Sequence, residues 1–121
     1  MRRHTSLEEL HLRYAPLNTG AAMGAVVDAC IALRLRTMTL QVCCIVPAAL
    51  PELTRLIVAG ALRELQVVNN RVEMFGEAHD STRLFVAAVR ASAMTRLCLN
   101  NVGVLQVDVV EAAAFINARP H

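Results

Sequence analysis

The chain has 121 residues, of which 55% are hydrophobic and 18% charged, and its formal net charge is +2. This composition excludes an intrinsically disordered chain, and basic residues without a run longer than Arg2-Arg3 do not predict a nucleic-acid partner. The longest charge-free stretch, residues 37–51, contains two prolines and is shorter than the roughly 20 apolar residues that span a bilayer. No apolar signal core precedes Glu8, so we expect an intracellular, cytoplasmic protein without a membrane partner.

The first predicted strand follows residues 1–6, and its alternation places Leu7, Leu10 and Leu12 on the buried side. Asn18-Thr19 then supplies an N-cap for a helix that extends to Leu33. Apolar residues recur in this helix at spacings of three and four and form its predicted buried face: Met23, Val26, Val27, Cys30 and Ile31.

The second predicted strand lies around Met38–Leu40 and is followed by a helix from about Ala48 to Val58. Pro51 suits the first turn of that helix, and Gly60 is a stop signal after it. The predicted buried stripe consists of Leu50, Leu53, Leu56 and Ile57.

The third predicted strand, Leu65–Val67, leads into the longest connection, residues 73–79, and into a helix capped by Asp80 or Ser81. The inward face of this helix is predicted to be Leu84, Phe85, Ala88 and Val89. A fourth strand precedes a helix from Val109 to about Asn117, with Asp108 as its N-cap and with Val109, Ala112, Ala113 and Ile116 as its apolar positions.

One spacing recurs through all four predicted strands. Residues 62–72 fit the frame L-x-x-L-x-L-x-x-N-x-L, and further copies begin at residues 7, 35 and 94, so that successive copies are 28, 27 and 32 residues apart. Cys43 and Asn70 occupy the Asn/Cys position of the second and third copies, whereas Ala15 and Val102 occupy it in the first and fourth. The first and fourth copies therefore lack the hydrogen-bonding side chain of Asn or Cys at this position.

These four copies resemble the long, ribonuclease-inhibitor-like subclass of the leucine-rich-repeat family. The resemblance implies an α/β fold, a right-handed solenoid of about four β-α repeats with a parallel concave sheet and helices on the convex side. We expect a single array over residues 1–121, a fragment of a longer array, with repeats at about 5–32, 33–59, 60–91 and 92–121. Members of this subclass nearly all act by binding another protein.

The resemblance implies that the concave sheet binds the partner, because the outward strand positions stack into columns. The predicted partner-binding residues are Glu9, His11, Arg13, Tyr14, Thr37, Thr39, Gln41, Glu64, Gln66, Asn69, Arg96, Cys98 and Asn100. Tyr14, Arg13 and Arg96 are the expected anchors, since aromatic and Arg residues dominate interface energies. The alternative for Tyr14 is a solvated edge residue, or one that packs on the repeat before it.

No residue pattern predicts catalysis, a metal or a cofactor. The four cysteines lack zinc-ligand spacing, no phosphate-binding glycine motif occurs, and His11 and Cys98 are expected three strands apart. We therefore expect a protein-binding module that is not an enzyme. Two alternatives remain: an uncapped structural fragment that only self-associates through its open ends, and a GTPase-activating or adaptor-type surface on the same scaffold.

Overall fold

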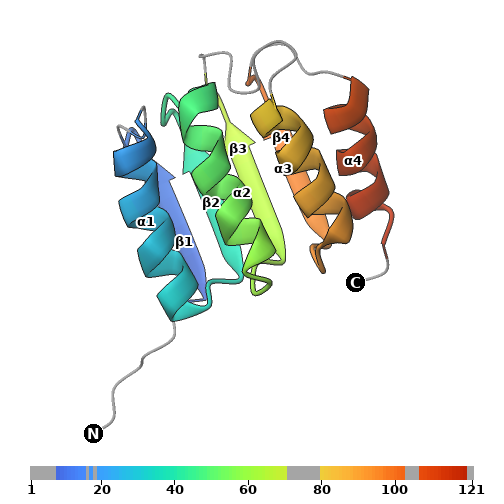
Figure 1. Ribbon diagram of the computed structural model, residues 1–121, viewed down its shortest axis with the longest axis horizontal. Helices are drawn as coiled ribbons and strands as arrows, with labels where there is room; N and C mark the ends of the chain where they lie inside the picture. The colour runs from blue at the N-terminus through green and yellow to red at the C-terminus, as the bar shows by residue number, and fades with distance from the viewer. Residues whose placement is uncertain (1–7, 16, 18, 71–79, 103–106, 120–121) are drawn as a thin grey trace, which may run out of the picture.

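The computed structural model describes residues 8–15, 17, 19–70, 80–102 and 107–119. Strands and helices alternate along the chain (Figure 1). In order they are β1 (Glu9–Arg13), α1 (Gly20–Leu33), β2 (Thr37–Gln41), the 3-10 helix η1 (Pro47–Ala49), α2 (Leu50–Val58), β3 (Glu64–Val68), α3 (Asp80–Ala91), β4 (Arg96–Asn100) and α4 (Val107–Asn117). Leu7, Asn18 and the predicted connection 73–79 lie outside the described residues.

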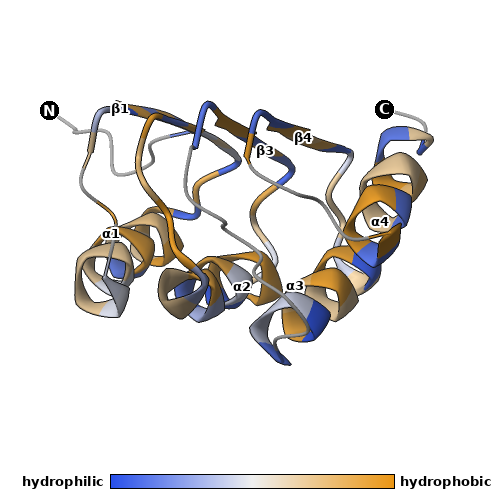
Figure 2. Cartoon of the chain, turned by 90° about the horizontal axis from the view of Figure 1, so that it is seen from above, coloured by the Kyte–Doolittle hydropathy of each residue, from blue (hydrophilic) through white to orange (hydrophobic). Residues whose placement is uncertain are grey.

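The four strands form one parallel sheet in the order β1-β2-β3-β4. Its register joins Glu9 to Thr37, Thr37 to Glu64 and Glu64 to Arg96, so the predicted columns are confirmed. All four α-helices lie on one side of the sheet, and the other side carries none of the described helices (Figure 2). The predicted α/β class with parallel strands and intervening helices is therefore correct.

Strand alternation directs one set of side chains under the helices, where they form the core. In β2 and β3 every second residue is fully buried, as the frame predicts: Met38, Leu40, Leu65 and Val67. The predicted stripe of α2, from Leu50 to Ile57, is also buried. In α1, Met23, Val27 and Cys30 are buried, while Val26 and Ile31 only pack against the core margin.

Helix boundaries follow local signals in most cases. The side chain of Thr19 accepts a hydrogen bond from the Ala22 N–H at 3.0 Å, which confirms an N-cap at the start of α1. Pro51 lies in the first turn of α2, and Gly60 has a φ of 94° just after this helix. Asp108 is not an N-cap, because α4 already begins at Val107. Its carboxylate lies in the first turn and there complements the helix dipole.

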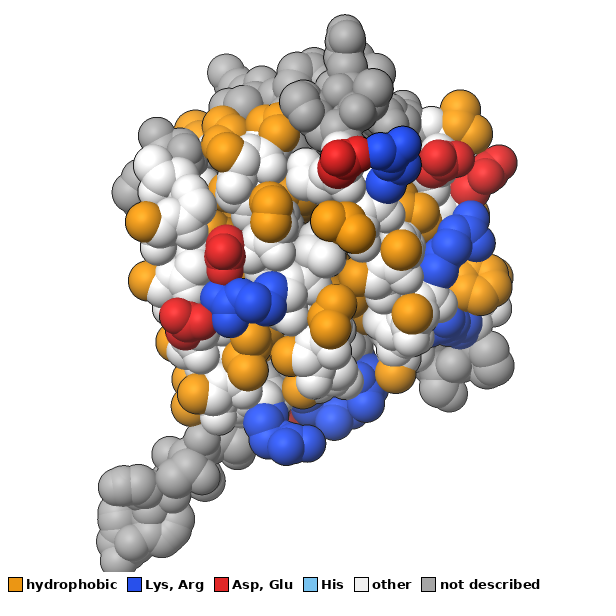
Figure 3. Space-filling view, viewed as in Figure 1, with side chains coloured by type: hydrophobic (Ala, Val, Ile, Leu, Met, Phe, Trp, Pro, Cys, Tyr) orange, Lys and Arg blue, Asp and Glu red, His pale blue; other side chains and the backbone are white. Residues whose placement is uncertain are grey.

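The predicted inward position of Leu84 is wrong, since this side chain is 60% exposed. Thr82, Phe85, Ala88 and Val89 face the core, and the side chain of Phe85 is fully buried there. Each residue advances an α-helix by about 100°, so Leu84 points well away from the direction that Phe85 takes. The large buried ring of Phe85 fixes the rotation of α3 and leaves Leu84 at the surface. Figure 3 shows hydrophobic side chains scattered among charged ones on the face of the molecule that the helices cover.

None of the described helices is long and apolar enough to cross a membrane.

Candidate functional site

The helix-free face of the sheet presents three rows of side chains in register. The rows are Glu9, Thr37, Glu64 and Arg96; His11, Thr39, Gln66 and Cys98; and Arg13, Gln41, Val68 and Asn100. Every predicted partner-binding residue, including Tyr14 and Asn69 beside these rows, is exposed or part-exposed. The core needs none of these side chains, and neighbours in a row lie about 4.8 Å apart, which is the spacing of strands.

Charge is unevenly placed on this face. Glu9 and His11 of β1 contact each other through Oε1 and Nε2 at 3.1 Å, and both side chains remain more than half exposed. Arg96 stands at the other end of the row that contains Glu9. The face therefore has guanidinium groups at both edges, on Arg13 and Arg96, and carboxylates on Glu9 of β1 and Glu64 of β3, with amides and hydroxyls between them.

The predicted anchors are brought together only in part. Tyr14 is 66% exposed, and the Cζ atom of Arg13 lies 5.1 Å from the centroid of its ring, within cation–π range. Arg96 belongs to β4, three strand spacings or about 14 Å from β1. Arg13 and Tyr14 therefore form one cluster at the β1 edge, and Arg96 is a separate contact point.

Each strand is followed directly by a residue with a left-handed backbone conformation. Tyr14, Val42, Asn69 and Asn101 occupy equivalent positions and have φ angles of 61°, 55°, 56° and 58°. The N–H groups of the first three donate to the carbonyls of Gln41, Val68 and Asn100, the last residue of the next strand. Asn101 Nδ2 also donates to Asn69 Oδ1 at 2.9 Å. The same left-handed backbone conformation therefore recurs directly after all four strands.

The Asn/Cys position of the frame fastens the loops behind these corners. Asn70 is fully buried, where its Nδ2 donates to the Ile45 carbonyl at 2.9 Å and its Oδ1 accepts from the Ile45 N–H at 2.6 Å. Cys43 Sγ donates to the Gln41 carbonyl at 3.4 Å, and burial raises the pKa of this thiol more than the backbone contacts lower it. Cys43 therefore stays protonated and a donor at neutral pH. Val102, at the same position, is buried without a hydrogen-bonding group.

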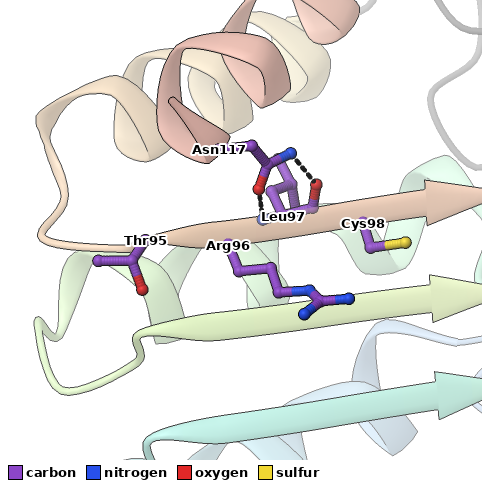
Figure 4. A pocket seen from close by; sticks show the side chains of 5 residues that line it. All are labelled: Thr95, Arg96, Leu97, Cys98 and Asn117. Carbon is purple, nitrogen blue, oxygen red and sulfur yellow. Dashed lines mark hydrogen bonds between the residues drawn. The ribbon is translucent and has the colours of Figure 1, made fainter. Parts of the chain in front are cut away.

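A cavity of about 340 Å³ lies at the free edge of β4 and is lined by Thr95, Arg96, Leu97, Cys98 and Asn117 (Figure 4). Asn117, at the end of α4, turns its amide onto the strand edge. Its Oδ1 accepts from the Leu97 N–H and its Nδ2 donates to the Leu97 carbonyl, both at 2.9 Å. Periodicity gave no signal for this contact, because the two residues are 20 positions apart and belong to different elements.

Arg119 makes further contacts near β4. Its Nη1 donates to the carbonyls of Ser92 and Met94 at 2.6 and 2.8 Å, which closes the turn between α3 and β4. Its guanidinium also lies 4.9 Å from the centroid of the Phe115 ring. Arg119, which follows α4, thus holds the turn before β4 through polar contacts that the sequence alone did not indicate.

The register also locates the reactive side chains. His11 and Cys98 share a row but belong to β1 and β4, and Glu9 and Glu64 are two strands apart. Neither pair is within hydrogen-bond reach at these strand spacings. Among the described residues, no three His, Cys, Asp or Glu side chains lie close enough to hold a metal ion.

Comparison with protein-family models, with curated proteins and with solved structures finds no match to this chain. Its function has to be inferred from the residues themselves.

Proposed function

We propose that this chain is a ribonuclease-inhibitor-like leucine-rich-repeat solenoid whose helix-free, concave sheet face binds another protein. The observation that carries the proposal is the in-register alignment of twelve outward-pointing residues across the four strands. Parallel strands in chain order with all helices on one side are typical of an array in which each repeat packs only on its neighbours. The division into repeats at about 5–32, 33–59, 60–91 and 92–121 belongs to the same proposal.

Three repeated details support the solenoid interpretation. The strand pattern of buried and outward residues is the same in β2 and β3. The left-handed corner recurs after all four strands. The Asn/Cys position hydrogen-bonds the preceding loop through Asn70 and its own strand end through Cys43. Unrelated strands and helices would not be expected to share these three features, whereas copies of one repeating β-α unit would.

The chemistry of the face favours a protein over a small molecule. It is open, and it mixes carboxylates, guanidinium groups, amides and the exposed ring of Tyr14. Such a mixture is typical of the polar parts of protein interfaces, in which Tyr and Arg are enriched. The sheet face formed by four strands of five residues covers an area on the order of 300 Å². This area is smaller than the roughly 800 Å² that each partner buries in a standard interface. Four repeats alone should therefore bind weakly, with the flanking corner residues adding contact area.

The proposal is tested by reversing charges on the two sides of the sheet. Arg13→Glu combined with Arg96→Glu should reduce partner capture by the immobilised chain at least tenfold, because reversed charges oppose a complementary surface. The matched control is Arg55→Glu combined with Arg83→Glu on the helices. These two residues form exposed ion pairs with Asp28, Glu52 and Asp80, which contribute little to stability.

Captured proteins are compared quantitatively by mass spectrometry, and circular dichroism checks that each variant is folded. The proposal requires that a defined set of proteins is lost with the sheet variant and kept with the helix variant. Loss with the helix variant alone would move the binding surface to the other face. Equal capture by both variants and the unaltered chain would contradict a sheet-face site.

A further inference from the structure

The two edges of the sheet differ in their backbone hydrogen bonding. At β4 the N–H and carbonyl of Leu97 are both bound by the Asn117 side chain. At β1 the Glu8 carbonyl accepts a hydrogen bond from the Thr37 N–H of β2, and the Tyr14 N–H donates to the Gln41 carbonyl. Because backbone groups alternate in direction along a strand, the even-numbered residues of β1 face β2. The odd-numbered residues, Glu9, His11 and Arg13, point their N–H and carbonyl groups away from β2, toward the edge beyond which no described strand lies.

An apolar layer continues beneath this free edge. Leu10 and Leu12 lie on the helix side of β1 and are only half-buried, unlike their equivalents in β2 and β3. In α1, a Cβ added at Gly20 or Gly24 would lie 3.6 Å from the Ala48 carbonyl oxygen and 3.4 Å from Glu52, so these positions face η1 and α2. The opposite flank of α1 therefore carries a wholly apolar series at spacings of four, three and four, which consists of Ala22, Val26, Ala29 and Leu33. All four residues of this series keep solvent exposure.

We propose that the occupant of this edge is a second copy of the chain, with the two β1 strands antiparallel about a two-fold axis at His11. This register pairs Glu9 with Arg13 of the second copy, and Arg13 with its Glu9. It uses the outward backbone groups at all three odd positions, as antiparallel hydrogen-bonded pairs require. It also sets Leu10 against Leu12 of the second copy on the helix side. One register thus satisfies charge, backbone and apolar contacts together, because the strand is self-complementary about its centre.

The helix layer is compatible with the same axis. The apolar series of α1 would meet its own copy, and the small side chains of Ala22 and Ala29 allow two helices to approach closely. Within the chain, neighbouring helices already contact each other on one side of the sheet. Packed helix axes are typically about 8 to 10 Å apart, and paired strands about 4.8 Å apart. The proposed contact would place the two α1 helices above the two β1 strands in the same way across the axis. It would join the two sheets into one of eight strands.

The other arrangement, β1 of one copy on β4 of the next, is disfavoured by the contacts at β4. It would bring Glu9 beside Arg96, but Asn117 occupies the Leu97 hydrogen-bonding groups that a new strand needs. It would also leave a free edge on every added copy and grow without limit. A two-fold contact at β1 closes after two copies and leaves the Asn117 contact intact.

The axis is tested by cross-linking at its centre. Opposite residues of a hydrogen-bonded antiparallel pair have Cα atoms about 5.5 Å apart, within the range of disulfides. In the full-length chain with Cys44→Ser and Cys98→Ser, we expect His11→Cys to form a covalent dimer under mild oxidation. Gln66→Cys lies in the same row on β3, away from the edge, and should remain uncross-linked. Equal cross-linking of both variants, or of neither, would overturn the proposed axis.

The register is tested by charge exchange, with sedimentation velocity over a hundredfold concentration range. Glu9→Arg or Arg13→Glu alone sets like charges opposite each other at both of the symmetry-related 9–13 pairs. We therefore expect the dissociation constant of the dimer to rise about tenfold or more. The double variant should regain the affinity, and an equimolar mixture of the two single variants should form the heterodimer. Arg96→Glu, which alters the proposed partner-binding face, should leave the dimer unchanged and so separates the two proposals.

Three outcomes would overturn this pairing. The unaltered chain could stay monomeric across the whole concentration range. The double variant could dissociate as strongly as either single variant, which would show that the charges are not paired across the axis. Arg96→Glu could weaken association as much as Glu9→Arg does, which would indicate head-to-tail stacking instead.

Discussion

The middle of the sheet and its β1 edge carry the same sequence pattern but are buried to different extents. In β2 and β3 the inward residues Met38, Leu40, Leu65 and Val67 are all fully buried. In β1 the equivalent residues, Leu10 and Leu12, keep part of their surface exposed. Having a neighbouring strand on one side only leaves both inward residues of β1 part-exposed. At the other edge of the sheet, where α4 packs on β4, Leu97 is buried and only Leu99 is part-exposed.

The helices show the same contrast. Apolar and polar residues are separated onto opposite sides in α2, whose buried stripe is Leu50, Leu53, Leu56 and Ile57. α1 has a single charged residue, Asp28, in 14 positions, and α4 exposes Val107, Val110 and Phe115. A helix that is apolar on most sides is usually one that is covered on most sides. The outer helices thus have more apolar surface than the described residues cover.

The largest effect should come from placing a charge in the middle of the sheet. Leu65→Asp buries an unpaired carboxylate and should cost several kcal/mol, enough to prevent stable folding. Gln66→Asp adds the same group one residue later on the helix-free face and should be tolerated. Soluble yield and thermal melting of the two variants provide the comparison, and similar losses in both would contradict the strand register.

The contrast between middle and edge is measured directly by Leu40→Ala and Leu12→Ala, which remove equivalent side chains from neighbouring strands. Leu40 is fully buried, and its truncation should cost about 2–5 kcal/mol. Leu12 already contacts solvent, so its truncation should cost about 1–2 kcal/mol. Urea unfolding of monomeric samples at low concentration gives both values. A Leu12→Ala effect as large as that of Leu40→Ala would mean that the edge is covered.

Two asparagines extend the comparison to hydrogen bonds. Asn70→Ala leaves the buried N–H and carbonyl of Ile45 unsatisfied and should cost about 2–4 kcal/mol. Asn117→Ala breaks an equivalent pair of bonds at the β4 edge, where water can replace the amide, and should cost about 1 kcal/mol. Urea unfolding measures the difference, while hydrogen exchange at Leu97 should accelerate only in the Asn117 variant. Similar losses of stability would argue that the β4 edge is shielded from water as fully as Ile45.

The smallest expected effect is a gain of stability. Val42 has a φ of 55°, a conformation that is strained for a β-branched residue and is readily adopted by Asn. Val42→Asn should therefore stabilise the chain by about 1 kcal/mol, and the reverse change, Asn69→Val, should destabilise it by a similar amount. Thermal melting of both variants tests whether the corner is the same in adjacent repeats. Destabilisation by Val42→Asn would show that contacts of the Val side chain outweigh the backbone strain.

The sequence by itself determined the strands, their order and the rows of outward residues. Inward and outward positions alternate with a period of two, and the frame recurs at a nearly constant interval. These two patterns together assign Glu9, Thr37, Glu64 and Arg96 to one row, as the strand register confirms. Asn70 could also be assigned a loop-fastening role, because its position in the frame is fixed.

Only the tertiary structure decided features that depend on contacts between distant residues. Phe85 set the rotation of α3 and left Leu84 outside, although both residues fit a helical apolar pattern. The contact of Asn117 with Leu97 joins a helix end to a strand edge, and no periodic signal couples these two elements. The unequal burial of Leu12 and Leu40 has the same origin: a sequence pattern specifies which way a side chain points, whereas the neighbouring element determines whether that direction is covered.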